Sequence, residues 1–490
     1  MQDRLNKNNT DRINKFTVFL TAILFIIGFA CAFIIALKSK SMPEYYDKLF
    51  ILPLVFSLCV LCCFPVLNHF VENFGVMLLT ALFLVRMCIS PALIAISGID
   101  ETIKLNIEIN TEKAIYLICY ECVVVFVILF LISKKDKSVV YLEKKQYMYT
   151  NERAKFYLLL FISAVLLLAF YCMDSHIFVG YRTIFQIKDP DFTSVENNYI
   201  VNQYGTTFVK KLALVLSNYL IKALRIIIPC LIMERLSKSK NKVMAAGLSI
   251  CCVLSCFFII DGAIARSFYY AVILMFVFVY LYSPKKMMWK MLIFFACGAV
   301  LVLMYWVLRY STGENKSIEG FFRYLSRSFS AYFSGVNVVS GAFNLPKDIE
   351  TQLHFFIYDY AKSIPLGNTL FGLTSEEVQP WFNEYNMSQG QIPPTIGMGY
   401  YYFGVVFAPL YSVIFAVLSY KASRKSMQMG KALYFAVYLL AAFYCALGII
   451  MYNISITIGN LIQIVLPMLI VSRYIYGREN KENNSLLLVR

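Results

Sequence analysis

Arginine is the residue whose type and placement in this 490-residue chain could best do chemistry. Five arginines flank long apolar runs, namely Arg182, Arg266, Arg309, Arg323 and Arg327. A guanidinium stays charged at physiological pH, and its planar fork donates two parallel hydrogen bonds to a phosphate. Several such forks predict a pyrophosphate site, in which Arg182 and Arg309 bind while Arg266, Arg323 and Arg327 stabilise developing charge. The alternative for any one of them is an ordinary solvated loop charge.

A base is predicted from the long polar segment 309–397. His354 is one of only three histidines in the chain and the only one in this segment. An imidazole titrates near neutral pH, which suits a general base. Asp359, Glu350 and Glu319 remain rival bases, and the alternative for His354 is a surface or packing role.

Aromatic residues cluster at the end of the same segment. Tyr401 and Tyr402 stand in the run Gln391–Gly404, and Trp381 precedes it. Such rings could stack on the rings of a bound ligand such as a sugar. The alternative is that they anchor the chain at a membrane interface, where tyrosine and tryptophan are enriched.

An amphipathic helix is predicted at the start of the polar segment, from Ile318 to Val336. Its apolar residues recur at helical spacing along one face. At about 100° per residue, Arg323 and Arg327 fall on the opposite face together with Ser330 and Ser334. We therefore expect this helix to lie flat on lipid or protein with its arginines turned away.

Composition sets the fold class: 59% of the residues are hydrophobic and only 15% are charged, which excludes a soluble globular chain. We expect an all-α polytopic membrane protein. Runs long enough to span about 30 Å of hydrocarbon predict twelve transmembrane helices. The predicted helices are Phe16–Ala36, Leu49–Leu67, Gly75–Ser97, Glu112–Ser133, Phe156–Cys172, Val209–Met233, Val243–Ile260, Ser267–Tyr282, Met291–Leu308, Met398–Tyr420, Ala432–Tyr452 and Ile454–Val471.

Lysine and arginine set the predicted orientation, because they concentrate on the cytoplasmic side of membrane proteins. With both termini inside, the inner segments hold 26 of the 45 basic residues and the outer segments 13. The chain is then divided into 1–308 with nine spans and a cytoplasmic N-terminus, 309–397 as a large extracytoplasmic catalytic loop, and 398–490 with three spans and a cytoplasmic tail. The net charge of +16 needs no nucleic-acid partner, since this bias supplies most of it.

Four charged residues fall well inside predicted spans, away from the span ends: Arg86, Glu121, Lys222 and Arg225. Charges inside a membrane are costly and usually functional. One interpretation is an internal ion pair between Glu121 and one of the cations, with Arg225 reaching toward the inner interface. The other is a cationic cavity for an anionic lipid headgroup, favoured by three cations against one anion.

Cysteine usage predicts no metal site. The 14 cysteines lie almost entirely inside predicted spans, where cysteine is usually a small core hydrophobe. Cys59-Leu-Val-Cys62 and Cys119-Tyr-Glu-Cys122 have no second pair or histidine at zinc spacing. We therefore expect neither a metal nor another cofactor.

Two short motifs carry a resemblance to a known family. Ala265-Arg-Ser267 enters one predicted helix, and Pro393-Pro-Thr-Ile-Gly-Met-Gly-Tyr-Tyr-Tyr-Phe-Gly404 opens another. Together with about twelve spans and a large late outer loop, they resemble the Wzy polymerases of bacterial O-antigen and capsular polysaccharide. Arg309 followed by ten residues and Gly320 fits the R-x10-G pattern of some members, with no second copy at Arg182 or Arg266.

The resemblance implies a metal-independent glycosyltransferase of the bacterial inner membrane that faces the periplasm. It would join undecaprenyl-pyrophosphate-linked oligosaccharide repeat units into O-antigen or capsule, with the lipid bilayer and a chain-length regulator protein as partners. The alternatives are an O-antigen ligase, which uses the same donor, and a lipid-linked oligosaccharide flippase or other transporter. A flippase should carry its charges along a central cavity and have short loops on both sides.

Overall fold

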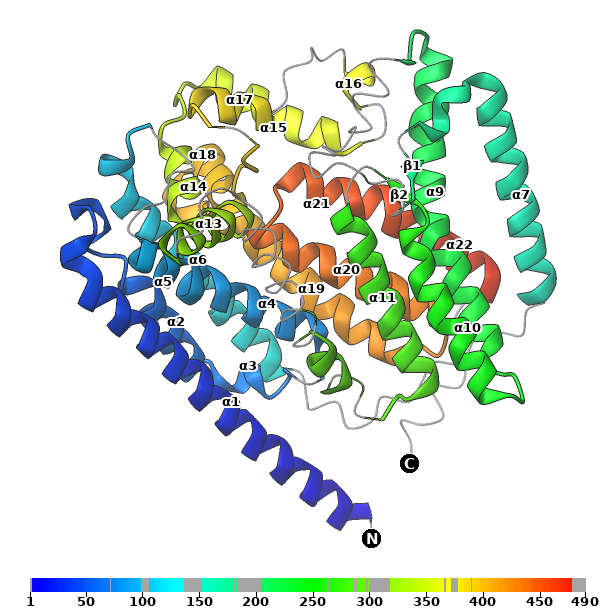
Figure 1. Ribbon diagram of the computed structural model, residues 1–490, viewed down its shortest axis with the longest axis horizontal. Coiled ribbons are helices and arrows are strands. Elements are labelled where there is room, and N and C mark those ends of the chain that lie inside the picture. The colour runs from blue at the N-terminus through cyan, green and yellow to red at the C-terminus, as the bar shows by residue number, and fades with distance from the viewer. Residues whose placement is uncertain are drawn as a thin grey trace.

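The computed structural model describes residues 2–70, 72–97, 105–135, 152–179, 181–183, 204–261, 264–285, 287, 289–295, 298, 318–364, 367–371, 378–388 and 390–477. These residues are helical apart from connecting turns and one short strand pair (Figure 1). A bilayer offers no hydrogen-bond partner to the backbone, so an apolar chain satisfies its peptide groups within helices.

The first half of the chain forms the elements α1 (Gln2–Lys38), η1 (Ser39–Ser41), η2 (Glu44–Tyr46), α2 (Ile51–Cys62), α3 (Phe64–Leu67), α4 (Phe74–Leu84), η3 (Val85–Ile89), α5 (Ser90–Ser97), α6 (Ile107–Lys135), α7 (Glu152–Met173), η4 (Ser175–Phe178), β1 (Tyr181–Arg182), α9 (Phe208–Leu236), α10 (Lys242–Leu254), η6 (Ser255–Phe257), β2 (Ile260–Asp261) and α11 (Ile264–Tyr282). The second half forms α13 (Ile318–Tyr332), α14 (Val336–Ser340), η7 (Gly341–Phe343), α15 (Ile349–Ser363), α16 (Gly367–Leu370), α17 (Val378–Tyr385), α18 (Thr395–Phe407), α19 (Leu410–Gln428), α20 (Ala432–Ile450), α21 (Ile454–Asn460), η8 (Leu461–Val465) and α22 (Leu466–Tyr476).

The chain is a multi-pass membrane protein. Within the described residues, eight helical segments are long and apolar enough to cross a membrane, or nine if one bent pair counts as a span. They match the first six and the last two predicted spans. The seventh and eighth correspond to the shorter apolar helices α10 and α11, and most of the ninth, Met291–Leu308, lies outside the described residues.

The tenth predicted span, Met398–Tyr420, is wrong as a continuous helix. The chain bends by 103° between α18 and α19. Gly404 has φ 74° and ψ −177°, outside the helical region, and Pro409 lacks the N–H that a continuing helix would need. A Cβ at Gly399 would meet the Ala408 carbonyl oxygen at 2.1 Å, so this close approach of α18 to the bend requires glycine.

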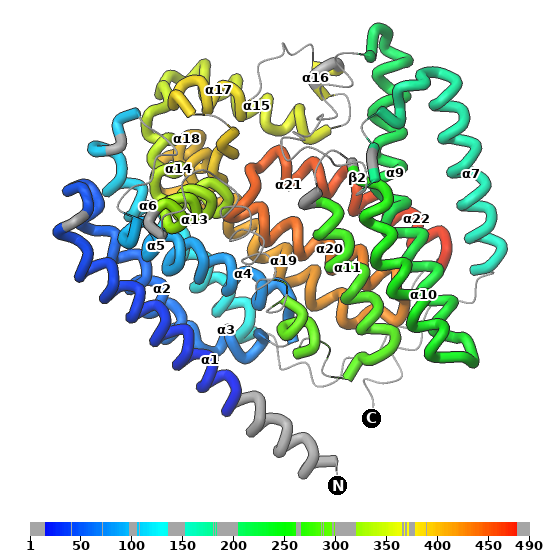
Figure 2. Tube along the Cα trace, viewed as in Figure 1, coloured from blue at the N-terminus to red at the C-terminus, as the bar shows by residue number. Residues whose placement is uncertain are grey.

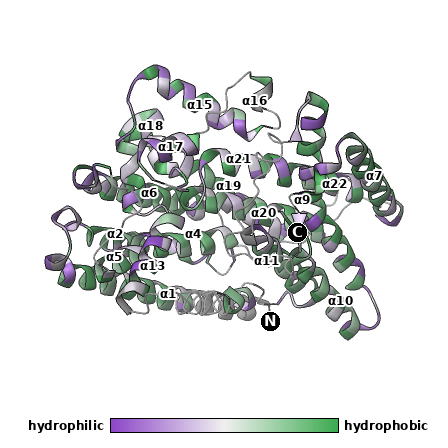
Figure 3. Cartoon of the chain, turned by 45° about the horizontal axis from the view of Figure 1, so that its top comes forward, coloured by the Kyte–Doolittle hydropathy of each residue, from purple (hydrophilic) through white to green (hydrophobic). Residues whose placement is uncertain are grey.

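Helix α20 is the centre of the bundle. It packs against α19 and α4 on one side and α9 and α11 on another, and nearly all of its residues are buried. Figure 2 shows the N-terminal helices α1–α5 and the helices α7, α9 and α10 on opposite sides of α19 and α20. Figure 3 shows hydrophobic residues predominating along the helices, with hydrophilic residues interspersed on α15.

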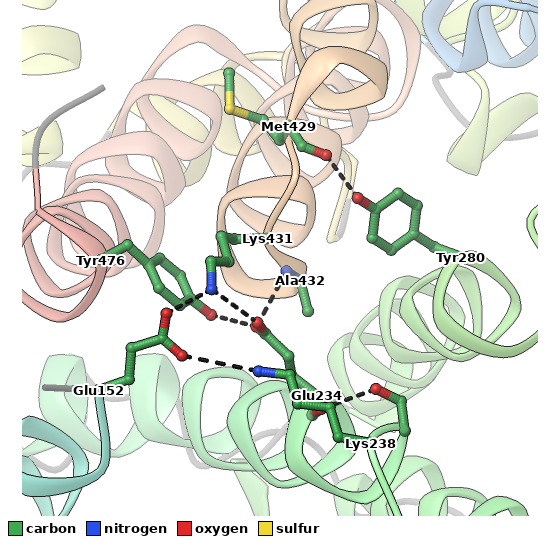
Figure 4. A network of polar contacts seen from close by, with 9 residues as sticks. Glu152, Glu234, Lys238, Tyr280, Met429, Lys431, Ala432 and Tyr476 are labelled. Atoms are coloured by element: carbon green, nitrogen blue, oxygen red, sulfur yellow. Dashed lines mark hydrogen bonds and ion pairs between the residues drawn. The ribbon is translucent and has the colours of Figure 1, made fainter. Parts of the chain in front are cut away.

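One polar network joins helix ends that the charge pattern predicts to be cytoplasmic (Figure 4). The Lys431 ammonium lies 2.5 Å from Glu152 Oε1 and 3.6 Å from Glu234 Oε1. The Tyr476 hydroxyl donates to Glu234 Oε2 at 2.5 Å. These residues belong to the start of α7, the end of α9, the α19–α20 connection and the end of α22. The four ends therefore share one face of the protein, as the predicted alternation of spans requires.

Segments predicted to lie outside also contact one another. Strands β1 and β2 pair antiparallel, with Arg182 opposite Ile260. Lys48, which follows the first predicted span, forms an ion pair with Glu112, which also lies at a predicted outer end. Figure 1 shows α15, α16 and α17 gathered along one edge, away from the start of α1. The outer elements thus form a second group on the opposite face.

Candidate functional site

The turn between α20 and α21, which we call the 448–455 turn, is where the outer elements meet. The Ser334 hydroxyl, at the end of α13, donates to the Ile450 carbonyl at 2.6 Å. The Thr395 hydroxyl, at the start of α18, donates to the Gly448 carbonyl at 2.6 Å. The loop helix and the motif that carries the family resemblance are therefore both fastened to this turn.

Two further elements reach the same turn. On α15, the Ser363 hydroxyl lies 3.2 Å from the Ser455 carbonyl, and α15 packs along α21. On α11, Tyr269 hydrogen-bonds with Tyr452. Asn453 fixes the direction of α21, because its side chain accepts from the Ile456 N–H at 2.8 Å as an N-cap.

Arg266 stands beside this turn. It occupies the first turn of α11 and is partly exposed. Its charge acts on Tyr269 of its own helix, on Tyr444 of α20 and on Tyr452 of the 448–455 turn. Its positive charge is thus held at the outer ends of α11 and α20.

Arg225 of α9 reaches the same end of α11. Its Nη2 donates to Ser267 Oγ at 2.7 Å and to the Cys256 carbonyl at 3.0 Å, and its guanidinium carbon lies 4.8 Å from the centre of the Tyr270 ring. The expectation that Arg225 extends toward the inner interface is therefore wrong. Its partners lie at the ends of α10 and α11 that the charge pattern predicts to be outside. Arg225 extends to these ends because two fixed acceptors and an aromatic face are available there. Lys222, one turn earlier on α9, is also buried.

Asp359 is buried on α15, which also adjoins the 448–455 turn, with 1% of its surface exposed. The Tyr402 hydroxyl donates to its Oδ2 at 2.6 Å. Its Oδ1 accepts no hydrogen bond from the part of the chain that the structure describes. Burial raises the pKa of Asp359 to about 6, although Tyr402, Ser455 and the charge of Lys362 each lower it.

His354, the base predicted from the sequence, is exposed on α15. Its ring centroid lies 4.4 Å from that of Tyr358. Phe355 of the same helix stacks on Trp381 of α17 at 3.8 Å. These aromatic contacts hold α17 over α15. Among the rival bases, Glu350 is exposed on the same helix, and the side chain of Glu319 lies outside the described residues.

The two tyrosines predicted to bind substrate have different environments. Tyr401 is 3% exposed, with its ring centroid 5.7 Å from that of Trp381, and its hydroxyl meets no hydrogen-bond partner among the residues the structure describes. Tyr402 is half-buried and gives its hydroxyl to Asp359. The structure thus brings Tyr402 to the carboxylate and leaves Tyr401 within the α15–α17–α18 packing.

Arg323 and Arg327 are exposed on α13, which packs against α5 and ends at the 448–455 turn. The predicted helix Ile318–Val336 breaks after Tyr332, where Ser334 has φ 46°. The expectation that Ser330 and Ser334 share the exposed face with the arginines is wrong, because both are buried. A Cβ at Gly335 would meet Ser330 Oγ at 2.4 Å, so the chain folds back onto this side of the helix while the longer arginines still reach out.

The structure does not describe the side chains of the two arginines predicted to bind the pyrophosphate. The backbone of Arg182 lies in β1, beside the β2 strand that precedes α11, and its side chain is outside the described residues. Arg309 lies outside them altogether. The strand pair brings the Arg182 segment to the same outer end as Arg266.

A buried ion pair joins two spans beneath the site. Arg86 Nη1 lies 2.5 Å from Glu121 Oε2, with both side chains fully buried. Arg86 Nε donates to the Ser334 carbonyl at 2.9 Å, and the Ser412 hydroxyl donates to Glu121 Oε1. The prediction that Glu121 pairs with an intramembrane cation is confirmed, and the cation is Arg86. This pair is connected to the 448–455 turn through Ser334.

Within the described residues, no three His, Cys, Asp or Glu side chains come together in a group that could hold a metal ion. Tyr269, Tyr452, Thr395 and Ser455 were not singled out from the sequence. The available signal was the short Tyr452-Asn453 break between two apolar runs, which marks a turn with an N-cap.

Comparison of the chain with protein-family models, with curated proteins and with solved structures gives no match. Any functional assignment therefore depends on the residues and their geometry.

Proposed function

We propose that this chain is a polymerase that joins undecaprenyl-pyrophosphate-linked oligosaccharide repeat units into O-antigen or capsular polysaccharide. The family resemblance suggests this activity. It is consistent with a multi-pass membrane protein whose helices α15, α16 and α17 gather along one edge.

One observation carries the proposal: a cationic group and a buried carboxylate both adjoin a single turn. Arg266 acts on Tyr452, and Ser455, three residues later in the same turn, acts on Asp359. Departure of a pyrophosphate is favoured by fixed positive charge, and activation of a hydroxyl requires a base within hydrogen-bond reach. The two groups that could supply these effects come from elements far apart in the sequence.

The reaction transfers the C1 carbon of the growing chain from the pyrophosphate to a hydroxyl of the incoming repeat unit. A hydroxyl of the incoming repeat unit attacks C1 at the reducing end of the growing chain, and the bond from C1 to the pyrophosphate oxygen breaks. Arg266 stabilises the charge that develops on the departing pyrophosphate, with Arg225 as a second positive charge at the same end of α11. Arg182, Arg309, Arg323 and Arg327 are the further candidates for this role. No step requires a metal.

The site then faces the periplasm from the bacterial inner membrane. This placement combines the positive-inside bias with twelve spans, in which α10, α11, the segment Met291–Leu308 and the bent α18–α19 pair each count as a crossing. The partners are the lipid-linked donor and acceptor, the bilayer and a chain-length regulator.

The first test replaces Arg266. Arg266→Ala should lower turnover of purified lipid-linked repeat units by about ten- to hundred-fold, because it removes a charge-assisted contact worth about 1.5–3 kcal/mol. Arg266→Lys should recover only part of this loss, since an ammonium lacks the two-pronged fork. Arg153→Ala, at the exposed predicted cytoplasmic end of α7, is the matched control and should keep full turnover. Wild-type chain length in Arg266→Ala would remove this arginine from the site.

A strain that lacks the chain distinguishes the alternatives. Single capped repeat units on a surface-polysaccharide gel indicate a polymerase, and complete loss of the cap indicates a ligase. Loss of the cap with accumulation of lipid-linked units in the cytoplasm indicates a flippase.

A further inference from the structure

Asp359 is the buried titratable group in the outer region whose surroundings are the hardest to explain by packing alone. Only 1% of its surface is exposed, and a buried carboxylate is normally fully hydrogen-bonded. Its Oδ2 accepts from Tyr402 at 2.6 Å, whereas its Oδ1 has no donor among the described residues. Leaving a buried acceptor unsatisfied costs about 1–3 kcal/mol, and replacement of Asp359 by an apolar residue would avoid that cost.

The carboxylate is held rigidly. Asp348 caps α15 by accepting from the Thr351 N–H at 2.8 Å, and the Ser363 hydroxyl donates to the Asp359 carbonyl at 2.9 Å at the other end. Tyr402 Oη also lies 3.3 Å from the Phe355 carbonyl. The orientation of the Asp359 side chain is therefore fixed by α15 and α18 together.

Groups from three neighbouring helices and from α15 itself affect its protonation. From α18 comes the Tyr402 hydroxyl, and from α19 comes Tyr411, whose hydroxyl lies 2.7 Å from that of Tyr360. From α21 comes Ser455, whose own hydroxyl donates to Asn453. On α15 itself, Lys362 contributes a positive charge. Three of these, Tyr402, Ser455 and Lys362, favour the carboxylate, and burial opposes them.

We propose that Asp359, and not His354, takes the proton of the acceptor hydroxyl, with Tyr402 as its positioning residue. This inference rests on the proposed function. The Oδ1 lone pair takes the proton while the acceptor oxygen forms its bond to C1 of the donor sugar. The bond from C1 to the pyrophosphate oxygen breaks, and its electron pair leaves with undecaprenyl pyrophosphate. Asp359 then returns its proton to water.

The assignment fits both the location and the acidity of the group. Because Oδ1 accepts no hydrogen bond from any residue that the structure describes, it can take a substrate proton without first losing such a bond. Because burial raises the pKa of Asp359 to about 6, it is both deprotonated and basic near neutral pH, which suits a general base. His354, by contrast, is exposed to solvent on α15.

The test measures the pH dependence of turnover of purified lipid-linked repeat units by the full-length protein. The wild-type rate should fall as pH drops through about 6, because protonated Asp359 cannot act as a base. Asp359→Asn should lose about 10²–10⁴-fold in turnover. Tyr402→Phe removes a hydrogen bond that lowers the pKa, so the acidic limb should move to higher pH. Glu384→Gln, which alters an exposed carboxylate on the neighbouring helix α17, is the control and should keep the wild-type profile.

His354→Gln separates the two candidates. If Asp359 is the base, the acidic limb survives in His354→Gln and is absent from the residual activity of Asp359→Asn. If the limb disappears in His354→Gln and persists in Asp359→Asn, the inference about Asp359 is overturned, but the proposed polymerase function is not contradicted. Absence of polymer from the wild-type protein would instead contradict the proposed function. Donor binding and thermal unfolding of Asp359→Asn should match wild type. If Asp359→Asn does not fold, the shift of the acidic limb in Tyr402→Phe is the deciding measurement.

Discussion

The buried pair of Arg86 and Glu121 gives a sharp stability prediction. Both side chains are fully buried, with 2.5 Å between Nη1 and Oε2. Removing one partner from such a pair leaves an uncompensated charge and costs about 3–5 kcal/mol. Each of Arg86→Met and Glu121→Gln should therefore be strongly destabilising. The double variant removes both charges together, so its loss should be smaller than the sum of the two single losses.

The structure also ranks the single variants. Arg86→Met additionally leaves the Ser334 carbonyl without its donor at 2.9 Å, whereas Glu121→Gln keeps an acceptor for the Ser412 hydroxyl. Arg86→Met should therefore be the worse of the two and should also loosen the end of α13. One kcal/mol shifts melting by about 2–4 °C in a domain of 150–250 residues, so we expect falls of about 5–10 °C in this longer chain.

The assay is thermal unfolding of the detergent-solubilised protein, followed by intrinsic fluorescence for the four members of the double-mutant cycle. The matched control is the exposed pair of Lys48 and Glu112, because exposed pairs contribute little. Glu112→Gln should leave the melting temperature unchanged within error. Strictly additive losses for Arg86→Met and Glu121→Gln would refute the reasoning, since they would show that the two charges do not depend on each other.

Two further predictions concern the loop helix and the topology. If α13 presents its arginines to the pyrophosphate, Arg323→Ala and Arg327→Ala should each lower turnover by about ten- to hundred-fold; near-normal turnover in the double variant would make this helix a scaffold. Reporter fusions after Lys240 should report the cytoplasm and fusions near Gln379 the outside, and an inside signal at Gln379 would refute the assignment of the outer loop.

The sequence predicted most spans because hydropathy over about 20 residues is set by the bilayer rather than by neighbouring elements. It did not predict the bend between α18 and α19. Gly404 and Pro409 both stood inside the apolar run, but glycine and proline are tolerated in membrane helices. Whether they bend the chain depends on packing such as that of Gly399 on Ala408.

Contacts between residues distant in the sequence also could not be predicted from the sequence. Glu121 had three possible cations, and only the packing of α6 against its neighbours selects Arg86. Asp359 stood as one of several rival bases, because its burial and its bond to Tyr402 depend on α15 meeting α18. Helical periodicity grouped Ser330 with the arginines, yet the fold-back at Gly335 covers it. Periodicity finds a face of a helix, and the tertiary fold decides what covers that face.

The most direct test of the central claim is turnover by the purified wild-type protein in vesicles that contain only undecaprenyl-pyrophosphate-linked repeat units. The account predicts a ladder of lengthening oligosaccharides and release of one undecaprenyl pyrophosphate for each bond formed, without added metal. Movement of intact lipid-linked units across the bilayer with no ladder and no released pyrophosphate would contradict it.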